Sequence, residues 1–549
     1  MEKLSQKKEK FRIIYLFPQE VGDFKGHNAI YTYFLRISNY LNSRKEELSG
    51  EIEEIYVDLR LEELPPFSFK DLAPYLEEAK VFLLKLYKAF PFSIIAISCY
   101  SSYEYLNSVI IACLIKSYIN PYIKIIVGGY HPTIIPEDFQ SDKFPSFIYE
   151  TFPKIKKIFE YLITGEGEIA FFELIKHLMN IESTERTNRK EDLEIIQGKM
   201  FPSLDELPII DLSLLKRYKD KLKGRRLNID FGRNCMFHCK ICPPATGREL
   251  PYHKRVRFKS IDKCIEELRI IRDTKWLETK AIMISDPVFF PKRRLRNEFY
   301  EKFRKFINEE GGFPYTISIY DRVNICTKED LLHYKKFNIQ PHLGFESASI
   351  PMLKNINKIS SKNDRHFETY IRKVENLIRY SNEINLIIWV NLIIGLPSET
   401  KEVIKDNQRF FLEKRFNGKG LSERYKIILS ILHYKALPGS IIYNDCEKKF
   451  GGKIYYKNWW RKPLANHRVY NKIVRPSKNL DFLTSLRLNY EWLKEFVQHQ
   501  IKNKTPFYDK GDFKILREGY FKISYMYKNR DVDYYSFIPE SWKQHIIFP

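Results

Sequence analysis

Three cysteines, Cys235, Cys239 and Cys242, lie within eight residues of one another in the spacing C-x3-C-x2-C. Thiolates are the side chains that hold iron–sulfur clusters. Three of them on one short loop can ligate three irons of a [4Fe–4S] cube and leave the fourth iron open. The alternative is a zinc site with His238 or Cys264 as fourth ligand. Zinc cysteines usually form two separated C-x2-C pairs, and no second pair exists here.

The cysteine loop directly follows the first of six strand-like apolar runs that alternate with longer helical segments. These runs are 227–231, 281–285, 315–319, 342–345, 387–394 and 426–432. Alternation of this kind is typical of parallel βαβ units. We therefore expect a partial or full β/α barrel of six strands over residues 206–445, with the cysteines at a strand end.

A second alternating series precedes the barrel. Its strand-like runs are 13–17, 54–57, 94–99, 123–127 and a short run before Gly165, and its helical segments include 31–42 and 106–119. The series predicts an open parallel-sheet, Rossmann-like domain over 1–180. Residues 181–205 are polar and are predicted to be a linker. Residues 446–549 are aromatic and basic, and we expect a mostly helical extension that packs over the barrel.

Composition and charge narrow the class of protein. The chain has 549 residues, 44% of them hydrophobic, which is typical of large globular domains. Eight scattered cysteines are too few for a secreted disulfide scaffold. The most apolar run, 384–394, contains two asparagines and is too short to span a membrane. No secretion signal is visible, so we expect a cytoplasmic protein in a reducing, anaerobic setting.

The formal net charge of +23 has two interpretations. Basic runs at 216–226, 254–257 and 292–296 could face an anionic substrate or form a peripheral membrane contact. Alternatively, the charge reflects a general abundance of Lys, Ile, Asn, Tyr and Phe, which an A+T-rich gene would produce. The sequence contains no recognisable base-reading motif, so no nucleic-acid partner is expected.

From the cysteine loop onward the chain resembles the radical S-adenosylmethionine (SAM) superfamily. Besides the three cysteines, the segments 321–324, 343–347 with 357–358, 394–400 and 437–443 are similar to that family's later strand-end motifs and occur in its order. The resemblance implies that SAM binds the open iron and is cleaved to methionine and a 5′-deoxyadenosyl radical. The residues that the resemblance places at SAM are Asp286, Arg322, Glu346, Ser347, Gly395 and Pro397.

Two positions depart from the family pattern. Ile241 stands where an aromatic residue usually precedes the third cysteine, which leaves an apolar contact to the adenine but no ring stacking. Ser285-Asp286-Pro287 replaces the Gly-Gly-Glu that many members carry after the second strand. Asp286 then either contacts the methionine amino group or only caps a turn.

The first domain is similar to the cobalamin-binding domain of cobalamin-dependent radical SAM enzymes. Its motifs are Ser98-Cys-Tyr-Ser101, Gly128-Gly-Tyr-His131-Pro-Thr and Gly165-Glu-Gly-Glu168. The resemblance implies that the corrin and its tail are lined by Ser98, Ser101, Gly128, Gly129, His131, Gly165 and Glu166. The spacing around His27 does not match a cobalt-ligating motif, so we expect cobalt without a protein histidine. The alternative is a degenerate sheet that binds nothing.

The combined resemblance implies an enzyme with a [4Fe–4S] cluster, SAM and cobalamin. Its predicted activity is methyl transfer from methylcobalamin to an unactivated carbon radical. A close rival is ring formation, ring rearrangement or carbon–carbon coupling in lipid, tetrapyrrole or natural-product biosynthesis. A rival of another class is a non-catalytic cobalamin or iron–sulfur sensor. Expected partners are a small-molecule, lipid or peptide substrate and an electron donor such as ferredoxin or flavodoxin.

Overall fold

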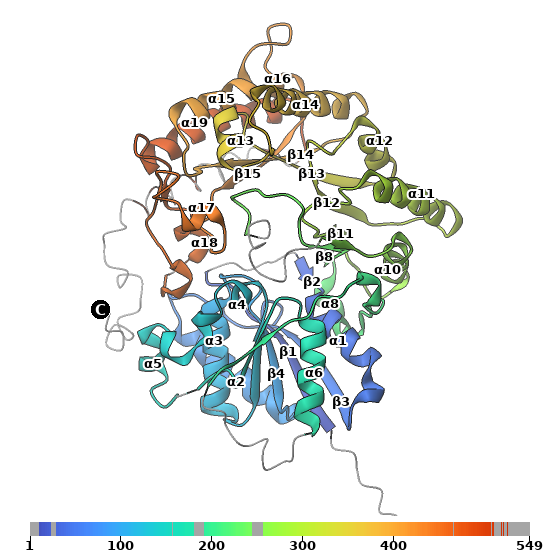
Figure 1. Cartoon of the computed structure of the whole chain (residues 1–549), viewed down its shortest axis with the longest axis vertical. Helices are drawn as coiled ribbons and strands as arrows, with labels where there is room; N and C mark the ends of the chain where they lie inside the picture. Colours follow the sequence, from blue (N-terminus) through green and yellow to red (C-terminus); the bar gives the residue numbers. More distant parts are fainter. Residues whose placement is uncertain are drawn as a thin grey trace, which may run out of the picture.

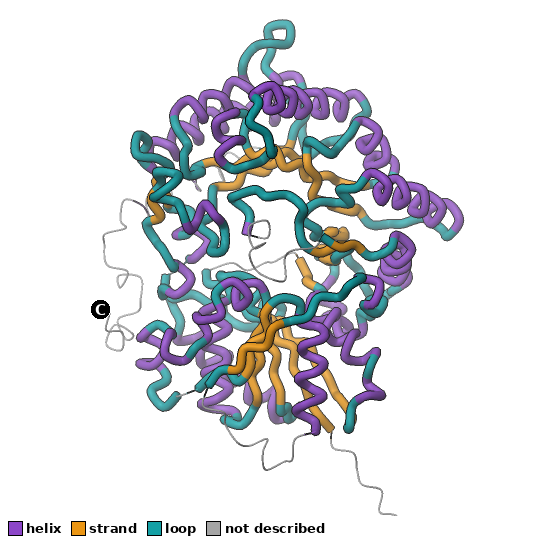
Figure 2. The backbone as a smooth tube through the Cα atoms, in the orientation of Figure 1, coloured by secondary structure: helices purple, strands orange, loops and turns teal. Residues whose placement is uncertain are grey.

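The computed structural model describes residues 10–22, 29–155, 157–180, 192–243, 256–464, 466–506 and 508–509, and the single residues 518, 520, 524 and 527. Two parallel sheets dominate the fold, one in each half of the view in Figure 1. Figure 2 shows the strands of the first sheet side by side and those of the second sheet spread along an arc. Both predicted series of strands are therefore present.

The first sheet has six parallel strands in the order β3-β1-β4-β5-β6-β7. Their bounds are β1 Lys10–Phe17, β3 Glu51–Asp58, β4 Ile94–Ser98, β5 Lys124–Gly128, β6 Tyr161–Thr164 and β7 Glu194–Gln197. All five residues of β4 are buried, as expected for a strand covered on both faces. The chain order reverses between β1 and β4, and open α/β sheets bind ligands at the carboxyl ends beside such a reversal.

Helices cover both faces of this sheet. They are α1 Tyr33–Ser43, α2 Ala73–Ala89, α3 Tyr105–Leu114 and α6 Gly167–Asn180, with the short helices α4 Tyr130–Ile134 and α5 Ser146–Thr151. Helix α1 packs against α6. The strand β7 lies inside the segment that the sequence assigned to a linker. It is an edge strand with half-exposed and exposed side chains, so it lacks the apolar run that marks the other strands.

The second sheet has seven parallel strands in the order β15-β14-β13-β12-β11-β8-β2. The six predicted barrel strands are β8 Arg226–Ile229, β11 Ala281–Ile284, β12 Thr316–Arg322, β13 Ile339–Glu346, β14 Trp389–Ile394 and β15 Ile428–His433. The seventh, β2 (Ala29–Tyr31), comes from the N-terminal region and pairs with β8. The first domain therefore completes one edge of the barrel sheet.

An outer ring of helices surrounds the barrel strands (Figure 1). It contains α10 Ile261–Asp273, α11 Arg293–Glu309, α12 Lys328–Lys336, α13 Ile350–Asn355, α14 Asp364–Glu383, α15 Lys401–Leu412 and α16 Leu421–Arg424. Helix α14 shows why these segments pack here, because its buried residues recur at the three- and four-residue spacing of one helical face. Short pieces complete this part: α8 Lys219–Leu222, β9 Gly232–Arg233 and β10 Arg257–Phe258.

The C-terminal part is helical, as predicted, and it contacts both halves of the molecule. It contains α17 Ile441–Asn444, α18 His467–Tyr470, α19 Phe482–Lys502 and the short pair β16 Lys453–Ile454 and β17 Val474–Arg475. Helix α19 packs against α15 and α16 of the barrel. The indole of buried Trp460 donates to Asp138 Oδ2 of the first domain at 2.6 Å. Within the described residues, no helix is long and apolar enough to cross a bilayer.

Candidate functional site

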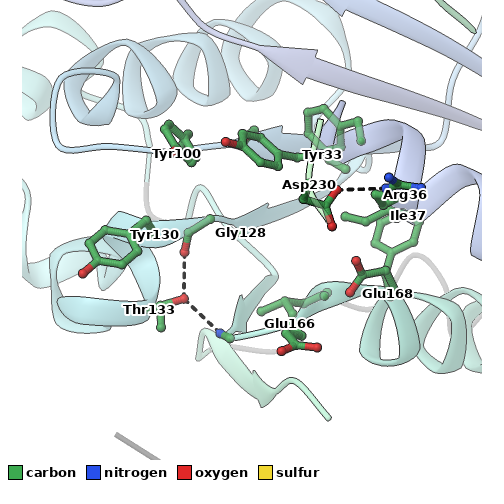
Figure 3. A pocket seen from close by; sticks show the side chains of 18 of the residues that line it. Tyr33, Arg36, Ile37, Tyr100, Gly128, Tyr130, Thr133, Glu166, Glu168 and Asp230 are labelled. Carbon is green, nitrogen blue, oxygen red and sulfur yellow. Dashed lines mark hydrogen bonds and ion pairs between the residues drawn. The ribbon is translucent and has the colours of Figure 1, made fainter. Parts of the chain in front are cut away.

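A cavity of about 350 Å³ opens at the carboxyl ends of β4, β5 and β6 (Figure 3). Five of the residues predicted to contact cobalamin line it: Ser98, Gly128, Gly129, Gly165 and Glu166. Its deeper wall is apolar and comes from strand and helix side chains: Phe34, Ile97, Ile126, Ile163 and Phe171. The cavity thus combines apolar side chains and glycine backbone with charged residues such as Arg36, Glu166 and Asp230.

Gly129 shows why glycine is required at the rim of this cavity. Its φ is +121°, a conformation that side chains disfavour. A Cβ there would lie 2.5 Å from the carbonyl oxygen of Cys99. The turn is further held by Thr133, whose Oγ1 donates to Gly129 O at 2.7 Å and accepts from the amide of Gly165 at 2.9 Å. The two glycine motifs are thus joined by one hydroxyl.

Two residues predicted to contact cobalamin, Ser101 and His131, do not line the cavity. Ser101 donates from its amide and its hydroxyl to Glu104 at 2.7 and 2.6 Å. His131 is 1% exposed and lies between Ser102 Oγ at 2.7 Å and Asp138 Oδ2 at 3.2 Å. His131, which belongs to α4, therefore packs against Trp460 and does not line the cavity.

Three tyrosines that the sequence did not point to, Tyr33, Tyr100 and Tyr130, line the cavity. Tyr33 and Tyr100 stack with ring centroids 4.8 Å apart, and Tyr31 stacks on Tyr33 at 5.4 Å. Burial raises the pKa of Tyr33 well above its usual value, so it is protonated at neutral pH. Tyr130, at the start of α4, has a hydroxyl that is buried without a hydrogen-bond partner. Figure 3 shows the rings of Tyr33, Tyr100 and Tyr130 among the side chains that line the cavity.

Acidic residues of the Gly165-Glu-Gly-Glu168 motif hold the two domains together. Glu166 pairs with Arg233 at 2.9 Å and with Arg257. Glu168 also pairs with Arg233. Arg233 lies two residues before the first cysteine of the loop, so Glu166 contacts both the cavity and the cysteine segment. Sequence reasoning placed Glu166 at the corrin and missed its two arginine partners.

The pairs of Glu166 and Glu168 with Arg233 and Arg257 form a clamp between the two domains. A second buried ion-pair network lies next to this clamp. Arg36 of α1 donates to Asp230 at 3.0 Å and pairs with Glu267, which also accepts from Lys259 at 2.9 Å. Burial by itself would raise the pKa of Asp230, but the nearby cations Arg36, Lys259 and Arg233 hold it well below its usual value. Asp230 therefore stays ionised at the end of β8, where the chain enters the cysteine loop.

The cysteine loop is held by backbone contacts to the later barrel segments. The amide of Lys240 donates to Ile356 O at 2.9 Å, and its carbonyl accepts from Ile442 of α17 at 3.2 Å. Cys239 is buried, whereas Cys235 and Cys242 are partly exposed. Within the described ranges, no three His, Cys, Asp or Glu side chains are arranged as a metal site. The loop nevertheless brings three thiols to one strand end, the donor set that a cluster uses.

Arg322, predicted to contact SAM, lies against the cysteine loop. Its Nη1 donates to Cys239 Sγ at 3.1 Å. Its guanidinium carbon lies 3.8 Å from the centroid of the Phe237 ring. Arg322 is thus the residue that connects the end of β12 to the predicted cluster ligands.

Glu346 and Ser347, at the end of β13, have different environments. Glu346 has a φ of +72° and accepts from the ammonium of Lys358 at 2.8 Å. Gly344 makes room for this pair, since a Cβ there would lie 2.8 Å from Glu346 Oε1 and 2.9 Å from Lys358 Nζ. Ser347 is 1% exposed, and its hydroxyl donates to Asn407 of α15 at 3.1 Å. Only Glu346 is therefore available at the strand end; Lys358 is an addition that sequence reasoning did not assign.

Gly395 and Pro397 follow β14. The amide of Gly395 donates to buried Glu399 Oε1 at 3.0 Å, and the other oxygen of Glu399 accepts from Ser485 at 2.5 Å. Burial raises the pKa of Glu399 to about 7. Glu399 thus connects the Gly395 turn to α19, and Pro397 is buried behind that turn.

Asp286 is the last predicted SAM contact. It is 2% exposed and accepts from the amide of Phe231 at 2.9 Å, which ties the end of β8 to the segment after β11. Burial raises its pKa to about 7. Asp286 thus joins two segments that are 55 residues apart in the chain, and its contact with SAM stays a prediction.

Comparisons with known proteins bear on the fold. No protein-family model matches the chain. No curated protein matches it either. Among solved structures, the radical SAM methyltransferase TsrM from Kitasatospora setae, with tryptophan substrate and the SAM analogue aza-SAM bound, is 13% identical. The match covers 79% of this chain and 75% of that chain, with a TM-score of 0.54.

Two further structures agree. TsrM with cobalamin and a [4Fe–4S] cluster bound is 14% identical, with a TM-score of 0.53 over 79% of this chain and 74% of that chain. The cobalamin-dependent SAM radical enzyme OxsB is 16% identical, with a TM-score of 0.57 over 96% of this chain and 72% of that chain. These matches confirm the predicted architecture of an open α/β domain, a partial barrel and a helical C-terminal part. The chain has the fold of the cobalamin-dependent radical SAM enzymes.

Proposed function

We propose that this chain is a cobalamin-dependent radical SAM enzyme that transfers a methyl group to an unactivated carbon of a small-molecule, lipid or peptide substrate. The observation that carries the proposal is the position of the cavity. Its lining includes Arg233 and Asn234, the two residues directly before Cys235. A ligand over Gly128 and Gly129 would therefore lie next to the cysteine loop.

The chain's residues divide between three binding tasks. Cys235, Cys239 and Cys242 would hold the cluster, and the glycine-rimmed cavity would hold cobalamin. The Gly395 turn and Glu346 would bind SAM. When bound, the cluster with SAM supplies a hydrogen-abstracting radical, and cobalamin supplies methyl transfer. A low-potential protein such as ferredoxin or flavodoxin would deliver the electron.

The neighbouring residues position these groups. The Glu346–Lys358 pair offers a carboxylate and an ammonium at one strand end, which suit the hydroxyls and the carboxylate of a SAM-like ligand. The stacked rings of Tyr33 and Tyr100 line the same cavity and would offer an apolar surface to its ligand. The structural neighbour TsrM is a methyltransferase, which supports methyl transfer over other outcomes of the same cofactors.

The test uses the full chain, reconstituted with iron and sulfide and loaded with cobalamin under anaerobic conditions. Iron and cobalamin per chain are measured first. The protein is then incubated with SAM and a low-potential reductant, and 5′-deoxyadenosine and S-adenosylhomocysteine are followed by mass spectrometry. We expect both products, because a radical methyl transfer consumes one SAM as radical source and another as methyl donor.

Other results would redirect the assignment. Deoxyadenosine without S-adenosylhomocysteine would contradict methyl transfer and favour cyclisation, rearrangement or carbon–carbon coupling. Binding of both cofactors with neither product, in repeated trials with several reductants, would favour a non-catalytic sensor. A chain that binds no cobalamin would contradict the role given to the cavity.

A further inference from the structure

The guanidinium of Arg322 is held from several sides in a buried position. Arg322 as a whole is 6% exposed. Nε donates to Asn324 Oδ1 at 3.2 Å, and Nη2 donates to the carbonyl of Lys358. Nη1 donates to Cys239 Sγ at 3.1 Å, and the Phe237 ring lies under the plane at 3.8 Å. These contacts fix one N–H on the sulfur of a predicted cluster ligand.

Two acidic residues stand near Arg322: Asp321, which precedes it in the chain, and Glu346, at the end of the neighbouring strand β13. Each forms an ion pair with another cation. Asp321 pairs with Arg296 at 2.9 Å. Glu346 pairs with Lys358 at 2.8 Å. Among the described residues, no carboxylate forms an ion pair with Arg322. A buried cation is stabilised by a nearby negative charge, and the sulfur of Cys239, 3.1 Å from Nη1, would supply one when it ligates a cluster.

We propose that Arg322 is the countercharge of the Cys239 thiolate and raises the reduction potential of the cluster that this cysteine would ligate. The inference rests on the proposed function, since it requires a cluster on the loop. Hydrogen bonds to cluster sulfurs and nearby charge both set iron–sulfur potentials. Reduction adds an electron to a centre that already carries thiolate charge, so a fixed cation with a donated hydrogen bond stabilises the reduced form most.

This role differs from the contact with SAM that the sequence predicted for Arg322. Three of its donor groups are occupied by the protein, and one of these faces the sulfur. Arg322 is therefore a positioning residue that acts through Cys239. The electron from the donor would reach the cluster more readily with Arg322 present than without it.

The experiment is an anaerobic redox titration of the reconstituted full chain, without SAM or substrate, followed by the electron paramagnetic resonance signal of the reduced cluster. Arg322→Gln removes the charge and the fork of donors. Arg322→Lys keeps the charge but loses the fork. The matched control is Arg293→Gln, which removes an arginine charge from α11 that is paired with Asp330 at 2.7 Å.

With Arg322→Gln, we expect the ratio of reduced to oxidised cluster at a fixed solution potential to fall about tenfold, a shift of ~59 mV for one electron. Arg322→Lys should fall in the same direction by a smaller amount. Arg293→Gln should match the unchanged chain. Iron per chain is measured for every variant, so that potentials are compared only between proteins that hold a full cluster.

Equal midpoint potentials for Arg322→Gln and the unchanged chain would overturn the inference, and so would an equal shift in Arg293→Gln. Where Arg322→Gln takes up too little iron, the lysine variant decides, and an unaltered potential in it would overturn the inference. Absence of any cluster in the unchanged chain would instead contradict the proposed function.

Discussion

Two sites at the carboxyl ends of parallel strands can be compared within this one chain. The cavity of the first sheet is an open space of about 350 Å³ whose rim is backbone at Gly128 and Gly129. At the ends of the barrel strands, by contrast, polar side chains are paired with one another. Glu346 is paired with Lys358, and Glu399 is bonded to Ser485. A ligand can enter the cavity without displacing a protein partner, whereas a ligand at Glu346 must compete with an ammonium.

The difference teaches how each site depends on its residues. The cavity depends on shape, and shape is lost when an atom is added. The barrel end depends on charges and hydrogen bonds, and these are lost when a partner is removed. Substitutions that add an atom in one region and remove a partner in the other should therefore have different effects.

The largest effect is expected from changing Cys235, Cys239 and Cys242 together to Ala. Iron per chain after reconstitution should fall to background, because these thiols are the predicted cluster ligands, while cobalamin binding to the cavity should persist. Cys264→Ala is the control, since that buried cysteine of α10 lies outside the loop. Undiminished iron in the triple variant, or loss of iron in the control, would refute the assignment.

The next effect concerns the shape of the cavity. Gly129→Ala should weaken cobalamin binding at least tenfold, because the new Cβ would lie 2.5 Å from Cys99 O at a positive φ. Gly311→Ala is a matched control, since Gly311 also has a positive φ, +88°, but has nothing within 4 Å of the added Cβ. Equilibrium binding measured by absorbance checks both. If the two variants bind equally, close approach is not what Gly129 provides.

The next largest effect should be a loss of stability when the clamp between the two domains is broken. Arg233→Gln leaves Glu166 and Glu168 without their shared partner, and we expect the free energy of unfolding to fall by about 3 kcal/mol. Arg269→Gln, which breaks more exposed pairs with Glu310 and Glu266, should cost under about 1 kcal/mol. Urea unfolding of each variant measures the difference. Similar losses for both would show that the clamp is no stronger than a surface pair.

The smallest effect is a pH dependence at the barrel end. Burial raises the pKa of Glu399 to about 7 from 4.5, so the folded chain binds its proton more tightly than the unfolded chain. Its contribution to stability is complete below pH 4.5 and is lost as pH rises through about 7, a total of about 3 kcal/mol of which on the order of 2 kcal/mol is lost between pH 5 and 8. Glu399→Gln should flatten this part of the profile, measured by urea unfolding between pH 5 and 8. Exposed Glu413→Gln should leave the profile unchanged.

Much of the fold was predictable because its signals are local. The buried runs that became β4 and β14 are apolar over consecutive or alternating positions, and neither needs a partner to be recognised. β2 and β7 were missed for the opposite reason. Each is three or four residues long, and β2 is recognisable only through its pairing with β8, which lies almost 200 residues away in the chain. Short strands carry too few side chains to show a period.

The candidate site likewise contains some features that the sequence predicts and others that it does not. The sequence reveals the three thiols because cysteines in this spacing are typical of cluster ligands. It reveals the Gly128-Gly129 turn because two glycines after a strand indicate an unusual backbone conformation. His131 and Ser101 carried the same kind of motif, yet their side chains bond to Asp138 and to Glu104 outside the cavity. The motifs thus mark loops that border the cavity without predicting which of their side chains line it.

The amino-acid sequence by itself determined the order of the elements, the position of the cysteine loop after β8 and the glycines that keep the cavity rim open. Only the tertiary structure decided which charges meet. Glu166 finds Arg233 and Arg257 in the barrel, and Arg322 finds Cys239. The physical reason is that periodicity and backbone preference act over a few neighbouring residues. Ion pairs and strand pairings instead depend on where segments far apart in the chain are brought together.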